Sequence, residues 1–248
     1  MPSDTSTASS PLFGARMAGA LWLIVILASI VALIGGTSLD LHGDPGTLAA
    51  NALTSASKIR FTYVILFFGK ICYLGGTVLL YELLKPVNKS VALFGAFCGL
   101  AGLLSGGAGS IHVLSALSLL EESRRATAPV ASQLQGAARI FLVTVPGFSG
   151  EDVFFGFQIL SVGYLIARSN FVPRGIGVLL VLGGLCFLVT SFTNFVSPVL
   201  GDRLAPLLLP IVLLGEASLA LWLLLRGVNV EQWRSTVARR TTINPAAV

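Results

Sequence analysis

The sequence predicts an all-α protein, a six-helix transmembrane bundle whose N- and C-termini are both cytoplasmic. Of the 248 residues, 54% are hydrophobic and 11% are charged, whereas soluble domains carry about 25% charged residues. Apolar runs of about 20 residues, the length that crosses a bilayer, recur along the chain. We place the transmembrane domain at residues 16–228. The predicted spans are residues 17–36, 61–84, 91–118, 148–167, 175–197 and 204–226.

The first span follows a segment rich in serine and threonine, residues 1–15, which we expect to be disordered and cytoplasmic. The apolar run that begins at Met17 is about 20 residues long, and the apolar core of a signal peptide has only about 7–15 residues. We therefore interpret this run as an uncleaved membrane span.

The second and third spans have clear boundary and packing signals. Lys58 and Arg60 precede the second span, and Pro86 follows it, where proline cannot continue a helix easily. The third span carries glycines at three- and four-residue spacing. These glycines are Gly95, Gly99, Gly102, Gly106 and Gly109. Because small residues at this spacing let neighbouring helices approach closely, we predict that the third span is a central helix.

Two connections and the C-terminal segment lie outside the spans. Residues 37–60 form a loop in which we expect a short helix near residues 47–57. In the longer connection before the fourth span, residues 130–145 could form either an interfacial helix or an extension of that span. Residues 229–248 form a polar cytoplasmic tail that we expect to fray.

The basic residues set the predicted orientation. Nine of the 16 lysines and arginines lie on the side of the two termini and six on the opposite side. The short loops at residues 85–90 and 168–174 together hold four basic residues and no acid. Because cytoplasmic loops carry the excess of basic residues, we predict that both termini face the cytoplasm. The net charge of +5 then reflects topology and contact with the lipid bilayer, and no nucleic-acid partner is expected.

Lys70 and Glu216 lie deep inside predicted spans. At about 1.5 Å of rise per residue, Lys70 is roughly 21 Å and Glu216 roughly 15 Å from the cytoplasmic boundary. A charge at the bilayer centre costs at least about 2.5–3.5 kcal/mol, so such a residue usually faces a partner or a watery cavity. Because the two depths are similar, a salt bridge between Lys70 and Glu216 is possible. The pair could fix the helix register, or it could belong to a binding site.

Helical spacing extends this polar interior. Tyr63, Lys70 and Thr77 share one face of the second span, and Glu151 and Gln158 share one face of the fourth. The candidate ligand-binding or ion-pairing residues are Lys70, Glu216, His112, Glu151, Asp152, Gln158, Tyr73 and Asn194. Simpler roles remain open for some of them: the two adjacent acids could only cap their helix, and the histidine could be an ordinary interfacial residue.

Three classes of function remain open. No zinc-protease, nucleophile-elbow, phosphate-loop or dinucleotide motif is present, and the three cysteines form no CxxC pair, so we expect no metal and no cofactor. The first class is a non-catalytic protein that binds a small lipophilic or polar ligand, or a partner. The second is a proton-coupled carrier that uses Lys70, Glu216 and His112 as a relay. The third is a membrane enzyme with Glu151, Asp152 and His112 as acid and base groups.

Short motifs in the same order along the chain resemble a bacterial family called domain of unknown function 4386. They are ARMAGALW at 15–22, LKPVNKS at 84–90, FFGFQ at 154–158, GYLI at 163–166, FVPRGIG at 171–177 and the stretch from Gly215 to Leu223. The resemblance covers residues 12–235. It implies a six-span integral protein of the bacterial plasma membrane, and it implies no activity.

Overall fold

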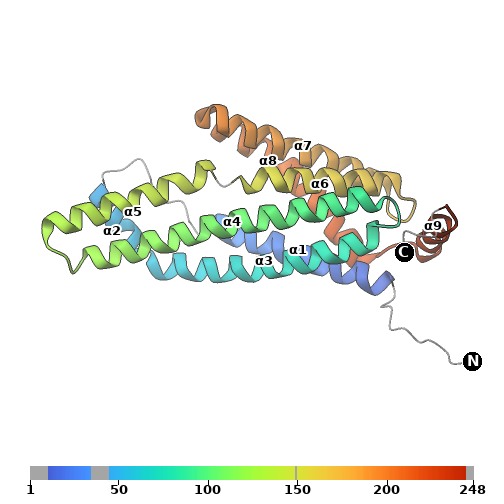
Figure 1. The fold of residues 1–248 in the computed structure, drawn as a ribbon, viewed down its shortest axis with the longest axis horizontal. Helices are drawn as coiled ribbons and strands as arrows, with labels where there is room; N and C mark the ends of the chain where they lie inside the picture. The colour runs from blue at the N-terminus through green and yellow to red at the C-terminus, as the bar shows by residue number, and fades with distance from the viewer. Residues whose placement is uncertain (1–10, 35–44, 149, 244–248) are drawn as a thin grey trace, which may run out of the picture.

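The computed structural model describes residues 11–34, 45–148 and 150–243, and within these residues the protein is all-α (Figure 1). The helices are α1 (Pro11–Ile34), α2 (Pro45–Thr54), α3 (Ala56–Leu84), α4 (Lys89–Ser123), α5 (Ala128–Phe148), α6 (Glu151–Arg168), α7 (Arg174–Val196), α8 (Pro198–Leu225) and α9 (Val230–Ile243). The all-α class that the sequence predicts is therefore confirmed. The disorder expected for residues 1–15 falls largely outside the described residues, and α1 begins at Pro11, ahead of the predicted boundary at Met17.

Five of the described helices, α1, α3, α4, α7 and α8, are long and apolar enough to cross a membrane. The chain is therefore a multi-pass membrane protein. The sequence predicts a sixth span at residues 148–167, which corresponds to α6. Helix α6 has 18 residues, and three of them, Glu151, Asp152 and Arg168, are charged, whereas each of the other five helices contains an apolar stretch of 18 residues with at most two charges.

The six long helices other than α5 close into one bundle. Each packs against the next in chain order, from α1 through α3, α4, α6 and α7 to α8, and α8 returns to pack against α1. Backbones approach closely where glycine leaves room: a Cβ atom on Gly19 of α1 would lie 2.7 Å from the Ala220 carbonyl oxygen of α8. Small residues are what allow membrane helices to pack at such short range.

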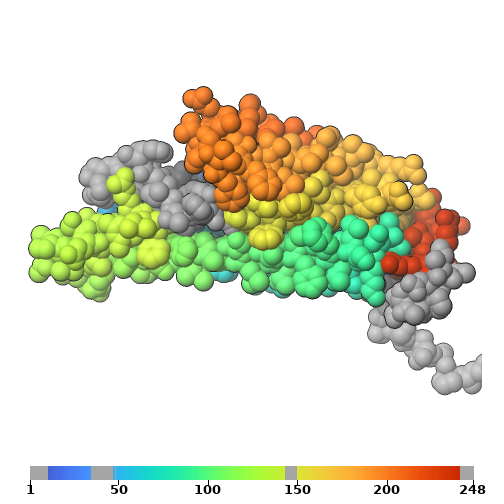
Figure 2. Space-filling model, turned by 45° about the horizontal axis from the view of Figure 1, so that its top comes forward, coloured from blue at the N-terminus to red at the C-terminus, as the bar shows by residue number. Residues whose placement is uncertain are grey.

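A second hydrophobic core lies at one end of the molecule, which we call the hairpin end. Here α2, the start of α3, the end of α4 and the middle of α5 bury Ile59, Leu117, Leu120 and Leu142 together. Arg60 on α3 also forms an exposed ion pair with Glu121 on α4 at 2.8 Å. Figure 2 shows that the α4–α5 hairpin extends well beyond the turn between α7 and α8.

The connection before α6 contains a helix of its own, separate from α6. Of the two possibilities for residues 130–145, the structure has a separate helix, α5, which packs against α4. Gly150, with φ at +54°, follows α5 and allows the chain to turn into α6. The short helix expected near residues 47–57 is confirmed as α2, although α3 already begins at Ala56.

The opposite end, which we call the α9 end, carries the C-terminal helix. We expect residues after Gly227 to fray, but residues 230–243 form α9. Trp233 donates a hydrogen bond from Nε1 to the Leu83 carbonyl oxygen at 3.0 Å, and Arg240 donates one to the Lys85 carbonyl oxygen. These contacts with the end of α3 stabilise α9. The polar sequence of this segment alone does not predict a helix.

Figure 1 places the start of α1, the α3–α4 and α6–α7 connections and α9 at this same end. The two short basic loops of the sequence, at residues 85–90 and 168–174, are therefore neighbours in space. The nine basic residues assigned to the terminal side of the membrane gather at this end.

Candidate functional site

The polar faces predicted on the second and fourth spans meet inside the bundle, in two adjacent clusters. The amide cluster consists of Tyr73 and Thr77 on α3 and Gln158 on α6. The ionisable cluster consists of Tyr63 and Lys70 on α3 and Glu151 on α6. The second cluster lies nearer to the hairpin end, because Glu151 opens α6.

The face of helix α4 that lies against both clusters consists of glycines, and we call this face the glycine floor. Four glycines lie opposite α6 residues in antiparallel order. The pairs are Gly95 with Ser161, Gly99 with Gln158, Gly102 with Phe155 and Gly106 with Glu151. A Cβ atom on Gly99 would lie 2.6 Å from the Gln158 amide carbon, and one on Gly106 would lie 2.6 Å from the Glu151 carboxylate carbon. The close approach predicted from the glycine spacing is confirmed, and it makes room for the polar side chains of α6.

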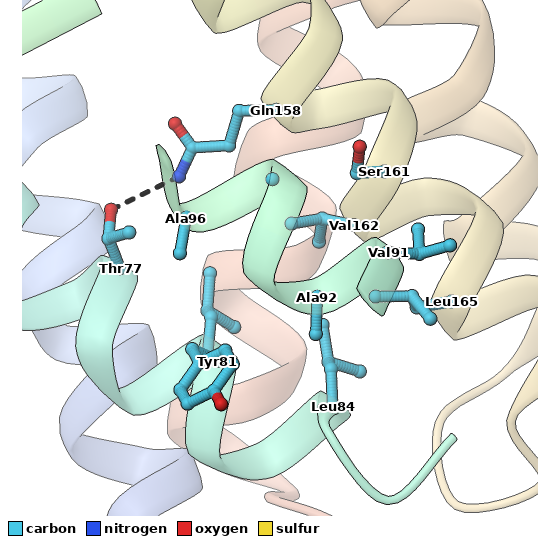
Figure 3. Close-up of a pocket in the computed structure, with 12 residues that line it drawn as sticks. Thr77, Tyr81, Leu84, Val91, Ala92, Ala96, Gln158, Ser161, Val162 and Leu165 are labelled. Atoms are coloured by element: carbon cyan, nitrogen blue, oxygen red, sulfur yellow. Dashed lines mark hydrogen bonds between the residues drawn. The ribbon is translucent and has the colours of Figure 1, made fainter. Parts of the chain in front are cut away.

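The amide cluster is buried and hydrogen-bonded. Gln158 is 1% exposed, its Oε1 accepts a hydrogen bond from the Tyr73 hydroxyl, and its Nε2 donates one to Thr77 Oγ1 at 3.1 Å. The cavity beside it, between α3, α4 and α6, measures about 10 Å³ (Figure 3). That volume holds at most about one water molecule, so the cluster is a packed polar element of the bundle.

Aromatic rings surround the Tyr73 side of this cluster. The Tyr73 ring centroid lies 5.0 Å from that of Phe155 and 5.1 Å from that of Trp22. Trp22 is 4% exposed, and its buried Nε1 has no hydrogen-bond partner among the described residues. By sequence, Trp22 fits an aromatic belt at the membrane interface, whereas in the structure its ring is buried inside the bundle. The signal for its burial is its i+3 spacing from Gly19, the residue on which α1 meets α8.

The ionisable cluster is arranged differently. Lys70 Nζ would lie 2.9 Å from a Cβ atom on Gly106, and the Glu151 carboxylate occupies that same position. The ammonium and the carboxylate interact electrostatically, and Tyr63 is also within electrostatic range of Glu151. Neither Lys70 nor Glu151 forms a hydrogen bond or a direct ion pair with another described residue. The Lys70 ammonium and the Glu151 carboxylate thus lie close together without forming a direct ion pair.

Glu216 does not form the salt bridge with Lys70 that their similar depth makes possible. The acid near the Lys70 ammonium is Glu151, whereas Glu216 lies within electrostatic range of Tyr73. Similar depth suggested the pairing, but α8 packs against α1 and α7, while α3 packs against α1 and α4. Among the described residues, Glu216 also forms no direct hydrogen bond or ion pair.

The remaining candidates lie in other places. Asp152 is half-buried beside Glu151 in the first turn of α6. His112 is exposed near the hairpin end, and its ring packs against Phe141 of α5 at a centroid distance of 5.6 Å. Asn194, at the end of α7, packs against Gly201 of α8. His112 and Asn194 therefore do not join the two clusters.

Comparison with known proteins gives one relationship. No curated protein and no solved structure matches the chain. The family model described as "Domain of unknown function (DUF4386)" matches residues 17–227, from the second turn of α1 to just past the end of α8. This match covers most of the 248 residues and confirms the resemblance seen in the sequence motifs. The chain belongs to the DUF4386 family of multi-span helical membrane proteins.

Proposed function

We propose that this protein is a non-catalytic, six-span protein of the bacterial plasma membrane that binds a small polar or amphiphilic ligand at the ionisable cluster. The observation that carries the proposal is the pair Lys70 and Glu151. Their opposite charges face each other inside the bundle and make no direct contact with described residues.

Helix α6 supplies the sixth span in this proposal. It packs between α4 and α7, and its 18 residues extend about 27 Å, close to the roughly 30 Å of a hydrocarbon core. Its charges lie only at its ends, with Glu151 and Asp152 in the first turn and Arg168 in the last. Acids at a helix N-terminus and a base at its C-terminus also complement the helix dipole. With six spans, both termini lie on one side, and the basic α9 end faces the cytoplasm.

A ligand would complete the ionisable cluster. Charges buried in a membrane protein are costly and usually mark binding or ion pathways. A ligand headgroup with a hydrogen-bond donor near Glu151 and an anionic or carbonyl oxygen near Lys70 would satisfy both. The amide cluster offers no comparable opportunity, because Gln158 already bonds to Tyr73 and Thr77.

The geometry favours binding over the two other classes. An acid–base enzyme with Glu151 and His112 needs both groups around one reacting atom. His112 is exposed beside Phe141, and it lies six residues beyond Gly106 on α4, roughly 9 Å along the helix axis. A relay through Lys70, Glu216 and His112 meets a similar difficulty, because no direct contact joins these residues: the acid near Lys70 is Glu151, Glu216 lies within electrostatic range of Tyr73, and His112 packs against Phe141.

Native mass spectrometry of protein purified in mild detergent tests the proposal. We expect a small bound molecule on the wild type that is lost from Glu151→Gln. The matched control is Glu122→Gln, the same chemical change at an exposed position near the end of α4, which should retain the ligand. The same bound species on all three proteins, or none on any of them, would contradict a ligand site at Glu151.

A further inference from the structure

A hollow of about 470 Å³ opens at the α9 end, remote from both polar clusters. Three separate segments line it: the α3–α4 connection, the α6–α7 connection and α9. The hydrogen bonds from Trp233 to Leu83 and from Arg240 to Lys85 hold α9 across the end of α3. The hollow is therefore built by the tertiary fold.

The lining of this hollow is strongly basic. Arg168 comes from the end of α6, and Arg239 and Arg240 come from α9, while no carboxylate is among the lining residues. The side chains of Arg168 and Arg239 are exposed. Three guanidinium groups around one space create a positive potential that attracts anions, and their planar forks suit phosphate oxygens.

The amide side chains of the lining add further donors. Asn88 caps α4, where its Oδ1 accepts a hydrogen bond from the Val91 amide at 3.1 Å, and the Asn170 Oδ1 accepts one from Arg174 at 3.3 Å. Because each carbonyl oxygen already accepts one hydrogen bond, the NH₂ donors of both amides are available to a ligand. Asn88 also places the N-terminus of the 35-residue helix α4, the positive end of its dipole, at the rim. Donors and positive charge from three segments thus converge on one space.

We propose that this hollow binds the phosphate of an anionic lipid headgroup. It lies where α3 and α6 end and α4 begins, at the level where membrane-spanning segments meet the headgroups. The Arg168 guanidinium lies 6.0 Å from the ring centroid of Tyr164, an exposed aromatic residue on α6, and such rings favour the membrane interface. Basic pockets between spans on the cytoplasmic side are suited to phosphate headgroups. A soluble phosphate ester has the same recognisable chemistry.

The test uses the full-length protein in nanodiscs of phosphatidylcholine with a small fraction of phosphatidylglycerol, and measures the lipids retained by native mass spectrometry. The test variant is Arg168→Gln with Arg239→Gln. The matched control, Arg124→Gln with Arg125→Gln, removes two exposed arginines at the hairpin end. Arg240 stays unchanged because it holds α9 to Lys85. Equal thermal unfolding of the three proteins verifies that each is folded.

We expect the wild type and the control to retain phosphatidylglycerol in preference to phosphatidylcholine. The test variant should lose about 30-fold in that preference, since each arginine near an anionic surface contributes about a factor of five. Glycerol phosphate and inorganic phosphate, added separately, distinguish the two sources of phosphate. Displacement of the lipid by either compound at micromolar concentration would assign the site to a soluble phosphate. Equal lipid retention by wild type and test variant would overturn the proposal.

Discussion

The amide cluster and the ionisable cluster bury polar groups in two different ways. Gln158 and Glu151 are two helical turns apart on the same face of α6, and both lie on glycines of α4. Gln158 finds its hydrogen bonds on α3, whereas Glu151 and Lys70 remain without a direct partner among the described residues. Buried polar groups that form hydrogen bonds with one another stabilise a bundle. Buried ionisable groups that lack a direct partner are candidates for a binding site. Substitutions can separate these two roles.

The largest expected effect comes from removing the glycine floor. Gly99→Leu should destabilise the protein by about 3 kcal/mol or more, because the new side chain would occupy the space of the Gln158 amide. Gly107→Ala is the control on the same helix, since a Cβ atom there meets nothing within 4 Å. It should be neutral or stabilise by up to about 1 kcal/mol. Unfolding by SDS in mixed micelles measures both, and similar stability of the two variants would contradict close packing at Gly99.

The next effect is the loss of the amide cluster's hydrogen bonds. Gln158→Leu leaves the Tyr73 hydroxyl without its acceptor, and we expect a cost of about 1–3 kcal/mol. Adding Tyr73→Phe and Thr77→Val to the same protein should recover part of this cost, because no polar group then remains unpaired. Ligand retention should survive in the triple variant. Loss of the ligand together with unchanged stability would reverse the roles of the two clusters.

A smaller effect distinguishes the neighbours of Lys70. In a double-mutant cycle on stability, Lys70→Met and Glu151→Gln should couple by about 1 kcal/mol, because the two charges interact directly. Lys70→Met and Glu216→Gln should add within about 0.5 kcal/mol, since no direct ion pair joins these two residues and the acid near Lys70 is Glu151. The reverse ranking of the two coupling energies would restore the pairing that depth alone suggests.

The smallest effect is expected at His112. This exposed side chain packs against Phe141 outside both clusters. His112→Ala should change the free energy of unfolding by no more than about 0.5 kcal/mol, and the bound ligand should be retained. A loss of ligand as large as that caused by Glu151→Gln would place the histidine in the site after all. Native mass spectrometry and SDS unfolding on the same preparations provide both readouts.

The sequence predicts most of the fold because the signals for membrane helices are local in the sequence. Runs of apolar residues give the spans, and seven-residue spacing correctly places Lys70 with Tyr63 and Thr77 on one face of α3. The glycine spacing likewise identifies the face of α4 that meets α6. These features depend only on helical period and residue size.

The errors arise where the answer depends on which helices are neighbours. Depth along a helix does not specify which neighbouring helix a side chain faces. Similar depth therefore makes a salt bridge between Lys70 and Glu216 possible, whereas the acid near Lys70 is Glu151 of α6. The sequence does not predict α9 either, because the hydrogen bond that holds this helix joins Trp233 to Leu83, 150 residues away. Burial of Trp22 likewise depends on the ring of Tyr73 on another helix.

The length of α4 connects two distant parts of the molecule. Its 35 residues form one continuous rod of about 52 Å, longer than a hydrocarbon core of about 30 Å. One part of this rod carries Gly106 beneath Lys70 and Glu151, and the other part belongs to the α4–α5 hairpin. A single continuous helix therefore connects the hairpin end with the glycine that lies against Lys70 and Glu151. Under the proposed function, a partner that tilts the hairpin would also shift Gly106 relative to the ligand site.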